Sequence, residues 1–214
     1  MTASQSPHPP PDLPFSQSCE KNQAPILAVL RQAFADRRRV LEIGSGTGQH
    51  GVYFAPRLPH LVWQTSDLAE NHAGIRAWQA AHPAPNLRAP LLLDLAHGDW
   101  PDGAYDAVFS ANTTHIVAWP LVQNLFALAG GHLPAGGLLA LYGPFNYGGT
   151  FTSESNRAFD AWLRQRDPKS GIRHFEDIAA LAAQHGLTLA QDHAMPANNR
   201  LLVFRRGAGA AGVE

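Results

Sequence analysis

The sequence predicts an α/β fold in which helices cover both faces of a seven-stranded, mostly parallel sheet. Short, almost wholly apolar segments alternate along the chain with segments of helical periodicity. Strands that are buried on both faces of a parallel sheet have this continuous apolar character. Only a short stretch without a helical pattern separates the last two apolar segments. Because a parallel crossover needs about a dozen residues or a helix, we expect the sheet to end in one antiparallel strand.

The predicted elements are bounded by prolines, glycines and capping residues. Asn22 is a candidate cap for the first helix, and Pro59 and Pro83 stop the second and third. The predicted strands are residues 39–43, 61–66, 88–95, 105–111, 137–142, 187–191 and 200–205. The predicted helices are residues 22–34, 49–58, 70–81, 120–131, 153–166 and 175–185.

The chain of 214 residues has the length of one domain. Residues 1–15 are rich in Pro, Ser and Gln, and residues 207–214 are rich in Gly and Ala. Such segments bury too little apolar surface to fold alone. We therefore expect a flexible arm over residues 1–15, a domain over residues 16–206 and a flexible tail over residues 207–214.

The charge balance and the cysteine content exclude several kinds of protein. With 16 basic and 17 acidic residues, the chain has no strong field that would attract nucleic acid or an anionic membrane. The lone Cys19 cannot form an internal disulfide or a cysteine-rich zinc site, and it fits a reducing compartment. No apolar stretch is long enough to span a bilayer. We expect a cytoplasmic protein without nucleic-acid or membrane partners, while its oligomeric state is not predicted.

The strongest local signal is the segment LEIGSGTG, in which Glu42 precedes Gly44, Gly46 and Gly48 at alternate positions. The glycines fall where a buried strand turns into a helix. Such a turn uses backbone angles that other residues avoid, and it lets a ligand approach the main chain. The next helix should offer free N–H groups to a phosphate or a carboxylate.

A dinucleotide-binding alternative rests on the same glycines. Gly46, Gly48 and Gly51 match the G-x-G-x-x-G pattern of nicotinamide-dependent oxidoreductases. The register of this match is poor, because two further residues lie between the end of the strand and Gly46. A match that starts at Gly44 places Gln49 where a small residue is required. The dehydrogenase therefore remains the less favoured alternative.

The pattern acid-x-Gly-x-Gly-x-Gly fits without strain and resembles that of the class I methyltransferases. In that class the glycine loop holds the methionine end of S-adenosylmethionine. The resemblance implies a Rossmann-like fold with S-adenosylmethionine as the cofactor. It also implies cofactor contacts at Glu42, Gly44, Ser45, Gly46 and Gly48.

Two acids support this cofactor. Asp67 closes the second predicted strand, where a carboxylate can accept hydrogen bonds from both ribose hydroxyls. Both hydroxyls are free in S-adenosylmethionine. Asp94 ends the third predicted strand, and in the class an acid at this place often contacts the adenine amine. A helix cap or a surface acid is the alternative interpretation of Asp94.

Further segments extend the resemblance over nearly the whole chain. The sequence is similar to the methyltransferase-like protein 26 family, itself a domain of unknown function, which implies the fold and the cofactor and supplies no substrate. The proline-rich extension before Phe15 is longer than the core of that family. The segments that carry the similarity are NQAPIL (22–27), GQH (48–50), WQTSD (63–67), YGP (142–144), SNRAFD (155–160) and MPANN (195–199).

Candidate catalytic residues follow the fourth and fifth predicted strands. Methyl transfer is an in-line displacement that depends on positioning and, for a neutral alcohol or an ammonium, on a base. Asn112 is expected to orient the cofactor or a polar group of the substrate. His115 has the right intrinsic pKa for a base, with a structural histidine as the alternative. Tyr142 is either a substrate contact or a core residue.

Four further residues are candidates for the substrate site: His50, Asn146, Asn198 and Asn199. The adjacent amides Asn198 and Asn199 also fit a tight turn, and His50 also fits a helix surface. No lysine is close to these residues in sequence, so we expect a pocket with few charges and a small, largely uncharged acceptor. The histidines form no pattern of metal ligands, so no metal is expected.

The methyl acceptor and the occurrence of catalysis are left open. The chain lacks the Asn/Asp-Pro-Pro-Tyr sequence of many enzymes that methylate amino groups of DNA and of protein glutamine. This absence and the near-neutral charge favour a small-molecule substrate. Because no catalytic residue is certain, a non-catalytic protein that binds S-adenosylmethionine, or a scaffold protein, is the second hypothesis.

Overall fold

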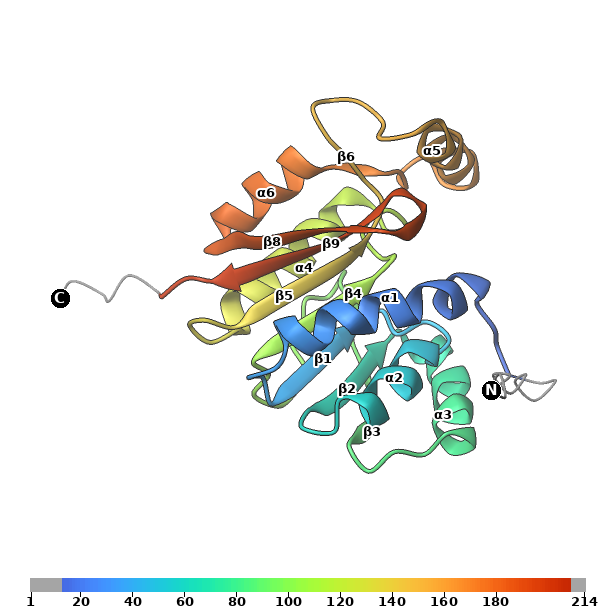
Figure 1. The fold of residues 1–214 in the computed structure, drawn as a ribbon, viewed down its shortest axis with the longest axis vertical. Helices are drawn as coiled ribbons and strands as arrows, with labels where there is room; N and C mark the ends of the chain where they lie inside the picture. Colours follow the sequence, from blue (N-terminus) through green and yellow to red (C-terminus); the bar gives the residue numbers. More distant parts are fainter. Residues whose placement is uncertain (1–12, 209–214) are drawn as a thin grey trace, which may run out of the picture.

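The computed structural model describes residues 13–208 and shows helices on both faces of one central sheet (Figure 1). The sheet has seven strands in the order β3-β2-β1-β4-β5-β9-β8, and β6 and β7 form a separate pair. The strands are β1 (Arg39–Ile43), β2 (Val62–Asp67), β3 (Leu87–Leu92), β4 (Ala107–Ala111), β5 (Leu138–Gly143), β6 (Phe145–Asn146), β7 (Arg173–His174), β8 (Leu187–Met195) and β9 (Asn199–Arg206).

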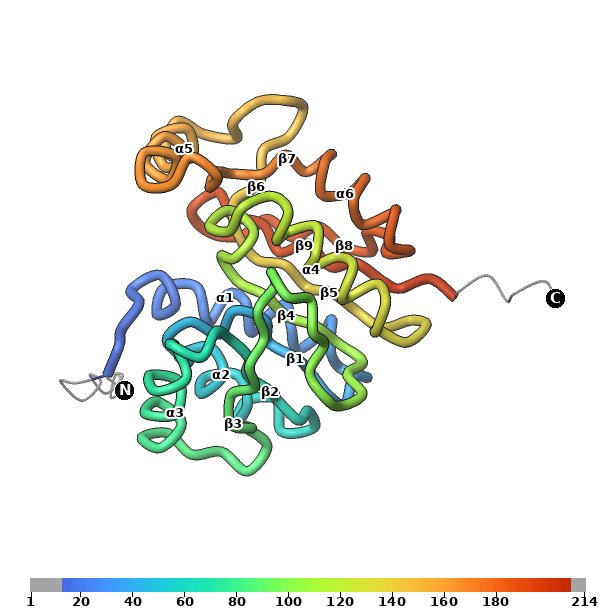
Figure 2. Tube along the Cα trace, turned by 180° about the vertical axis from the view of Figure 1, so that it is seen from behind, coloured from blue at the N-terminus to red at the C-terminus, as the bar shows by residue number. Residues whose placement is uncertain are grey.

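Two groups of helices enclose the sheet. Helices α1 and α2 cover one face, and α4 and α6 cover the other, as the two opposite views show (Figures 1 and 2). The helices are α1 (Gln17–Ala33), α2 (Gln49–Phe54), α3 (His72–Ala81), α4 (Trp119–His132), α5 (Glu154–Arg166) and α6 (Phe175–Gln184). Short 3-10 turns occupy η1 (Ala55–Arg57), η2 (Ala69–Asn71) and η3 (Pro196–Asn198).

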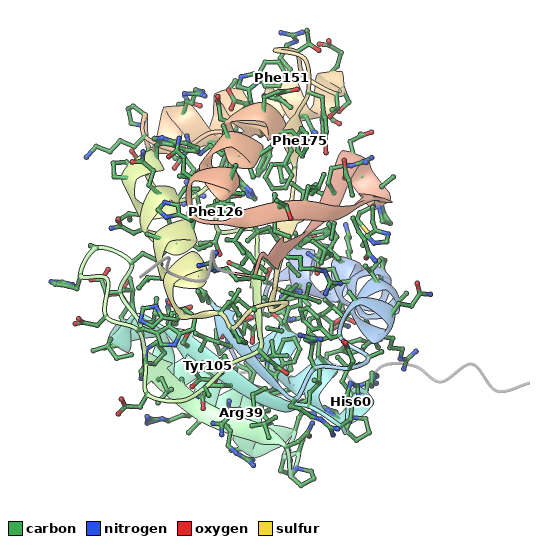
Figure 3. The ribbon with its side chains drawn as sticks, turned by 90° about the vertical axis from the view of Figure 1, so that its left-hand side faces the viewer. Arg39, His60, Tyr105, Phe126, Phe151 and Phe175 are labelled. Carbon is green, nitrogen blue, oxygen red and sulfur yellow. The ribbon has the colours of Figure 1, made fainter. Side chains whose placement is uncertain are left out.

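The sheet separates two apolar cores. In the core under α4 and α6, Phe126 of α4, labelled in Figure 3, is one of the buried side chains. Its ring packs edge-on against that of Phe204 of β9, with 5.8 Å between ring centroids. In the core under α1 and α2, Phe54 and Trp63 pack with 5.3 Å between ring centroids. Strands buried on both sides explain the continuous apolar runs of the sequence.

The expected antiparallel strand is β9, which pairs antiparallel with both β5 and β8. It does not form the edge of the sheet. Strand β8 turns through η3 directly into β9, with Met195 paired to Asn199, and lies outside it. Most of the expected loop after residue 191 is therefore strand, because β8 continues to Met195.

The first helix begins earlier than the sequence predicts. Ser16 caps α1 by accepting a hydrogen bond from the Cys19 backbone N–H at 3.3 Å. Asn22 is therefore not a cap; it is buried inside the helix and contacts α2. By contrast, α5 begins as expected, because the Ser153 side chain accepts from the Asn156 backbone N–H.

The folded part of the chain extends beyond residues 16–206 at both ends. The Pro14 carbonyl accepts a hydrogen bond from Nε1 of Trp78 at 2.6 Å, which fixes residues just before α1 against α3. The Gly207 N–H donates to the Gly186 carbonyl at 2.9 Å. Residues 1–12 of the expected arm and 209–214 of the expected tail lie outside the described residues. Within residues 13–208, no helix is long and apolar enough to cross a membrane.

Candidate functional site

Three adjoining cavities lie where the parallel strands end, which is where open α/β sheets bind ligands. The glycine-loop cavity, of about 420 Å³, lies over Gly44, Ser45 and Gly46. The asparagine cavity, of about 340 Å³, is lined by Asn22, Asn112, Asn156 and Asn199 among others. The acidic cavity, of about 120 Å³, is lined by Asp67 and Asp94. Gly44 lines both the acidic and the glycine-loop cavities, so these two adjoin.

The glycine loop brings two strand ends into close contact. Gly44 has a φ of +73°, and a Cβ placed on it would lie 2.8 Å from Oγ1 of Thr113, which follows β4. Gly48 has a φ of +90°, and a Cβ there would lie 3.0 Å from the Cα of Ile75 on α3. Both positions need glycine for conformation and for space. The sequence pattern therefore marks a backbone surface without side chains.

Four N–H groups of the loop are paired within the protein, those of Gly44, Ser45, Gly46 and Gly48. Gly44 N–H and Ser45 N–H both point to the Ser66 carbonyl at 3.1 Å, and Gly48 N–H donates to the Ser45 carbonyl at 2.9 Å. Gly46 N–H donates to Oδ2 of Asp67 at 2.6 Å. Helix α2 has only 6 residues, so its dipole is small.

Glu42 supports the loop from below and lines none of the three cavities. Its carboxyl group is buried, and Oε2 accepts a hydrogen bond from Nε1 of Trp63 at 2.9 Å. Burial raises the pKa of Glu42 to about 7, and the nearby Asp67 adds to this effect. In this structure the Glu42 side chain faces Trp63 and supports the loop, and its contact with the cofactor stays a prediction.

Asp67 and Asp94 meet in the acidic cavity, although they end different strands. The Asp67 carboxylate accepts hydrogen bonds from Gly46 N–H, from Leu68 N–H at 2.7 Å and from Nδ2 of Asn71 at 2.7 Å. Asp94 lies two residues beyond the end of β3 and accepts from the Ala96 N–H at 2.8 Å. This bond closes a local turn, which is neither the helix cap nor the free surface acid of the alternative interpretation, and Asp94 also lines the cavity.

Asn112 lies where the glycine-loop cavity meets the asparagine cavity and lines both, as do Ser18 and Phe159. It has a φ of +59°, in a region that non-glycine residues seldom adopt. Its N–H donates to the Tyr142 carbonyl at 2.8 Å, which ties the end of β4 to β5. Asn adopts this region more readily than most other residues, and the role predicted for Asn112 stays a prediction.

His115 lines the glycine-loop cavity and is almost completely buried. Its Nδ1 has no hydrogen-bond partner among the described residues. Burial lowers the pKa of His115 to about 4, and the charge of Arg173 lowers it further. The imidazole is therefore neutral at pH 7. A Cβ on Gly143 would lie 3.3 Å from His115 Nδ1 and 3.9 Å from Asn112 Oδ1, so these two atoms face the same glycine.

Tyr142 and His50 are linked through the buried Asn22. Oδ1 of Asn22 lies 2.7 Å from Nε2 of His50, and since an amide oxygen only accepts, Nε2 carries the proton. Burial lowers the pKa of His50 to about 4. Burial also raises the pKa of Tyr142, and hydrogen bonds with Asn22 and Asn199 offset part of this rise. His50 lines the glycine-loop cavity, while Tyr142 and Asn199 line the asparagine cavity.

Two of the four candidate substrate residues lie elsewhere. Asn146 is buried in β6, lines neither large cavity and has an unpartnered Oδ1. Asn198 is exposed in η3 with a φ of +56°, and its carbonyl accepts from Nδ2 of Asn156 at 3.2 Å. The turn interpretation therefore describes Asn198, whereas the neighbouring Asn199 faces the cavity.

The sequence did not reveal the contribution of α1 and α5. Lys21 lines the asparagine cavity, which corrects the expectation that no lysine is near the pocket. Cys19 lines the glycine-loop cavity, and Phe159 of α5 lines both cavities. The signal that could have located α1 was the Ser16 cap. Within residues 13–208, no group of three or more His, Cys, Asp or Glu side chains is placed to hold a metal ion.

The fold is shared with known methyltransferases. An O-methyltransferase family protein from Burkholderia thailandensis matches with a TM-score of 0.75 and 20% identity, over 88% of this chain and 57% of that one. The S-adenosylmethionine-dependent methyltransferase SibL matches with a TM-score of 0.75 and 20% identity, over 89% and 56%. An O-methyltransferase family 2 protein from Planctomyces limnophilus, in complex with apigenin, matches with a TM-score of 0.70 and 16% identity, over 86% of this chain and 61% of that one.

These matches show the Rossmann-like fold of class I S-adenosylmethionine-dependent methyltransferases. The chain spans a little more than half the length of each of the three structures. Residues 13–206 match the family model described as "Protein of unknown function (DUF938)", and the chain belongs to this family.

Proposed function

We propose that the protein is a methyltransferase that uses S-adenosylmethionine to methylate a small molecule. The observation that carries the proposal is the continuity of the three cavities. The acidic cavity meets the glycine-loop cavity at Gly44, and the glycine-loop cavity meets the asparagine cavity at Asn112. The cavities follow one another in the order in which a nucleoside, an amino-acid chain and an acceptor would lie.

The residues present fit S-adenosylmethionine. Asp67 and Asp94 offer carboxylates to hydroxyl and amine groups beside the apolar side chains of Leu68, Leu95 and Leu121. Gly46 lines the glycine-loop cavity, and a Cβ placed on it would meet nothing within 4 Å, so a ligand can lie close to the backbone there. The bound cofactor supplies a methyl group on a positively charged sulfur. The resemblance to the methyltransferase-like protein 26 family supports the same assignment.

The chain's own contribution is to position the acceptor, exclude water and accept a proton. Asn112 lies at the junction of the two large cavities, where an acceptor approaches the methyl group. Phe159 lies over both cavities. The neutral His115 presents an unpartnered Nδ1 in a buried site. We assign His115 the role of proton acceptor and Asn112 and Tyr142 the role of orienting the substrate.

A small-molecule acceptor agrees with the size of the asparagine cavity, about 340 Å³, which is at the lower end of the range for small-molecule sites. A cytoplasmic location, without nucleic-acid or membrane partners, belongs to the same proposal and rests on the lone cysteine and the balanced charge.

The test is transfer of a labelled methyl group from S-adenosylmethionine to a small-molecule extract. We expect the wild-type protein to transfer label and the folded Asn112→Ala variant to transfer at least tenfold less. Absence of transfer by wild-type protein that binds S-adenosylhomocysteine would instead establish a non-catalytic cofactor-binding protein. Binding of NAD without S-adenosylhomocysteine would establish the dehydrogenase alternative.

A further inference from the structure

We infer that the methyl acceptor carries an anionic group, and that Lys21 binds this group at the end of the asparagine cavity away from the reacting atom. The inference rests on the proposed function and identifies the chemical class of its substrate. It replaces the uncharged acceptor that the sequence alone had led us to expect.

The charges around the cavities are separated by sign. Lys21 is the one formally charged side chain in the lining of the asparagine cavity, and no carboxylate lines it. The two carboxylates of the site, Asp67 and Asp94, lie in the acidic cavity on the other side of the glycine loop. Within residues 13–208, Lys21 forms no ion pair. Its ammonium group is therefore free to pair with an anionic ligand.

The neutral lining of the cavity strengthens this preference. Amide and hydroxyl groups of Asn199, Ser155 and Tyr142 surround the space, together with Pro144 and Phe159. Several of the polar groups are already used inside the protein: Nδ2 of Asn199 donates to the Pro196 carbonyl at 3.1 Å. Lys21 is itself exposed, so its ammonium group lies at the solvent side of the cavity, where it can meet an incoming anion without a large desolvation cost. The lining can therefore orient a polar ligand, and Lys21 selects its charge.

The position of Lys21 also places the binding of the anionic group apart from the place where the methyl group is transferred. Lys21 lines the asparagine cavity and does not line the glycine-loop cavity, whereas Asn112 lines both. An acceptor held at Lys21 by its anionic group therefore presents a different atom at Asn112. That atom uses a lone pair to form the bond to the methyl carbon, and the departing sulfur keeps the electron pair of the broken bond. The acceptor's proton goes to His115, and the product keeps its anionic group.

Two lysines make a matched pair of variants possible, because Lys21 and Lys169 are the only lysines of the chain. Lys169 is exposed in the segment after α5 and lines none of the three cavities. Lys21→Met removes the charge and keeps the length of the side chain, and Lys169→Met is the control. An ion pair with hydrogen bonding to a charged group corresponds to a change of about tenfold or more in affinity.

The experiment repeats the labelled methyl transfer from an extract and separates the products by anion exchange at pH 8. We expect the wild type and Lys169→Met to give a labelled product that the anion exchanger retains. We expect Lys21→Met to give at least tenfold less of it, with unchanged affinity for S-adenosylhomocysteine. The purified product should also bind the S-adenosylhomocysteine-saturated Lys21→Met protein about tenfold more weakly in calorimetry.

The outcomes distinguish a failure of the inference about Lys21 from a failure of the proposed function. Labelled product that is neutral or cationic would overturn the inference and leave the proposed function standing. The inference would also be overturned if Lys21→Met and wild type gave equal yields of labelled product and bound that product with equal affinity. Absence of any labelled product would overturn the proposed function, and the inference with it.

Discussion

Replacing Glu42 by Gln tests whether this acid supports the glycine loop or contacts the cofactor. Glu42 is buried beneath the loop, with Nε1 of Trp63 as its hydrogen-bond donor at 2.9 Å. A glutamine has the same shape and keeps an oxygen for Trp63, but it carries no charge at any pH. The variant therefore isolates the cost of burying the carboxylate.

The magnitude follows from the pKa of Glu42, which burial raises from 4.5 to about 7. Because the folded protein favours the protonated carboxyl, the stability that Glu42 contributes is fully present below pH 4.5 and is lost as the pH rises through about 7. At 1.36 kcal/mol per pKa unit, the difference corresponds to about 3 kcal/mol. The free energy of unfolding of Glu42→Gln should therefore be about 3 kcal/mol higher than that of wild type at pH 8 and nearly equal to it at pH 4.5.

The assay is urea unfolding of both proteins from pH 4.5 to pH 8, read as the difference between them. This difference cancels the histidine contribution, because His50 and His115 are present in both. The pKa values of both histidines are lowered to about 4, so their contribution to stability is lost as the pH falls below 6.5. Glu70→Gln, on the exposed η2, is the matched control and should differ from wild type by less than about 0.5 kcal/mol at every pH.

A second readout separates support from contact. The affinity of Glu42→Gln for S-adenosylhomocysteine should stay within about threefold of wild type, because the side chain lines none of the cavities. The reasoning is refuted if the difference in unfolding free energy is flat with pH, or if the variant is less stable than wild type at pH 8.

Three further variants test other parts of the site. Asp67→Ala should weaken S-adenosylhomocysteine binding about tenfold or more in calorimetry, and should also lower the unfolding free energy because Gly46 N–H loses its acceptor; unchanged affinity would refute the ribose assignment. Gly44→Ala should lower the free energy of unfolding in urea more than Gly98→Ala does. The two glycines have nearly the same φ, +73° and +74°, but only a Cβ at Gly44 would meet a neighbour, Thr113. An equal loss of stability in the two variants would show that this close contact does not matter. Asn199→Ala should leave cofactor affinity unchanged and reduce labelled methyl transfer, and full transfer would leave it a turn residue.

The strands of the sheet, which local sequence patterns specify, were predicted from the sequence. The strands β1, β2 and β4 are largely buried, and their ends place Gly44, Asp67 and Asn112 at one edge of the sheet. Because open α/β sheets bind ligands at that edge, the strand ends were enough to predict where a candidate site would lie.

The parts that depend on tertiary packing were not predicted. Lys21 reaches the asparagine cavity because α1 begins at Gln17 and packs beside the glycine loop, where the side chain of Gln49 bonds the backbone of Ser16. Nothing in the spacing of Lys21 and Asn199 reveals that they line one cavity. Glu42 was assigned to the cofactor because its motif is a linear pattern, which does not state on which side of the loop a side chain lies.

The central claim is that the cavities hold S-adenosylmethionine, and the most direct measurement is a calorimetric titration of the purified protein with S-adenosylhomocysteine and, separately, with NAD. The account predicts saturable, one-to-one binding of S-adenosylhomocysteine and no saturable heat from NAD at the same concentrations. Saturable binding of NAD with no response to S-adenosylhomocysteine would contradict it.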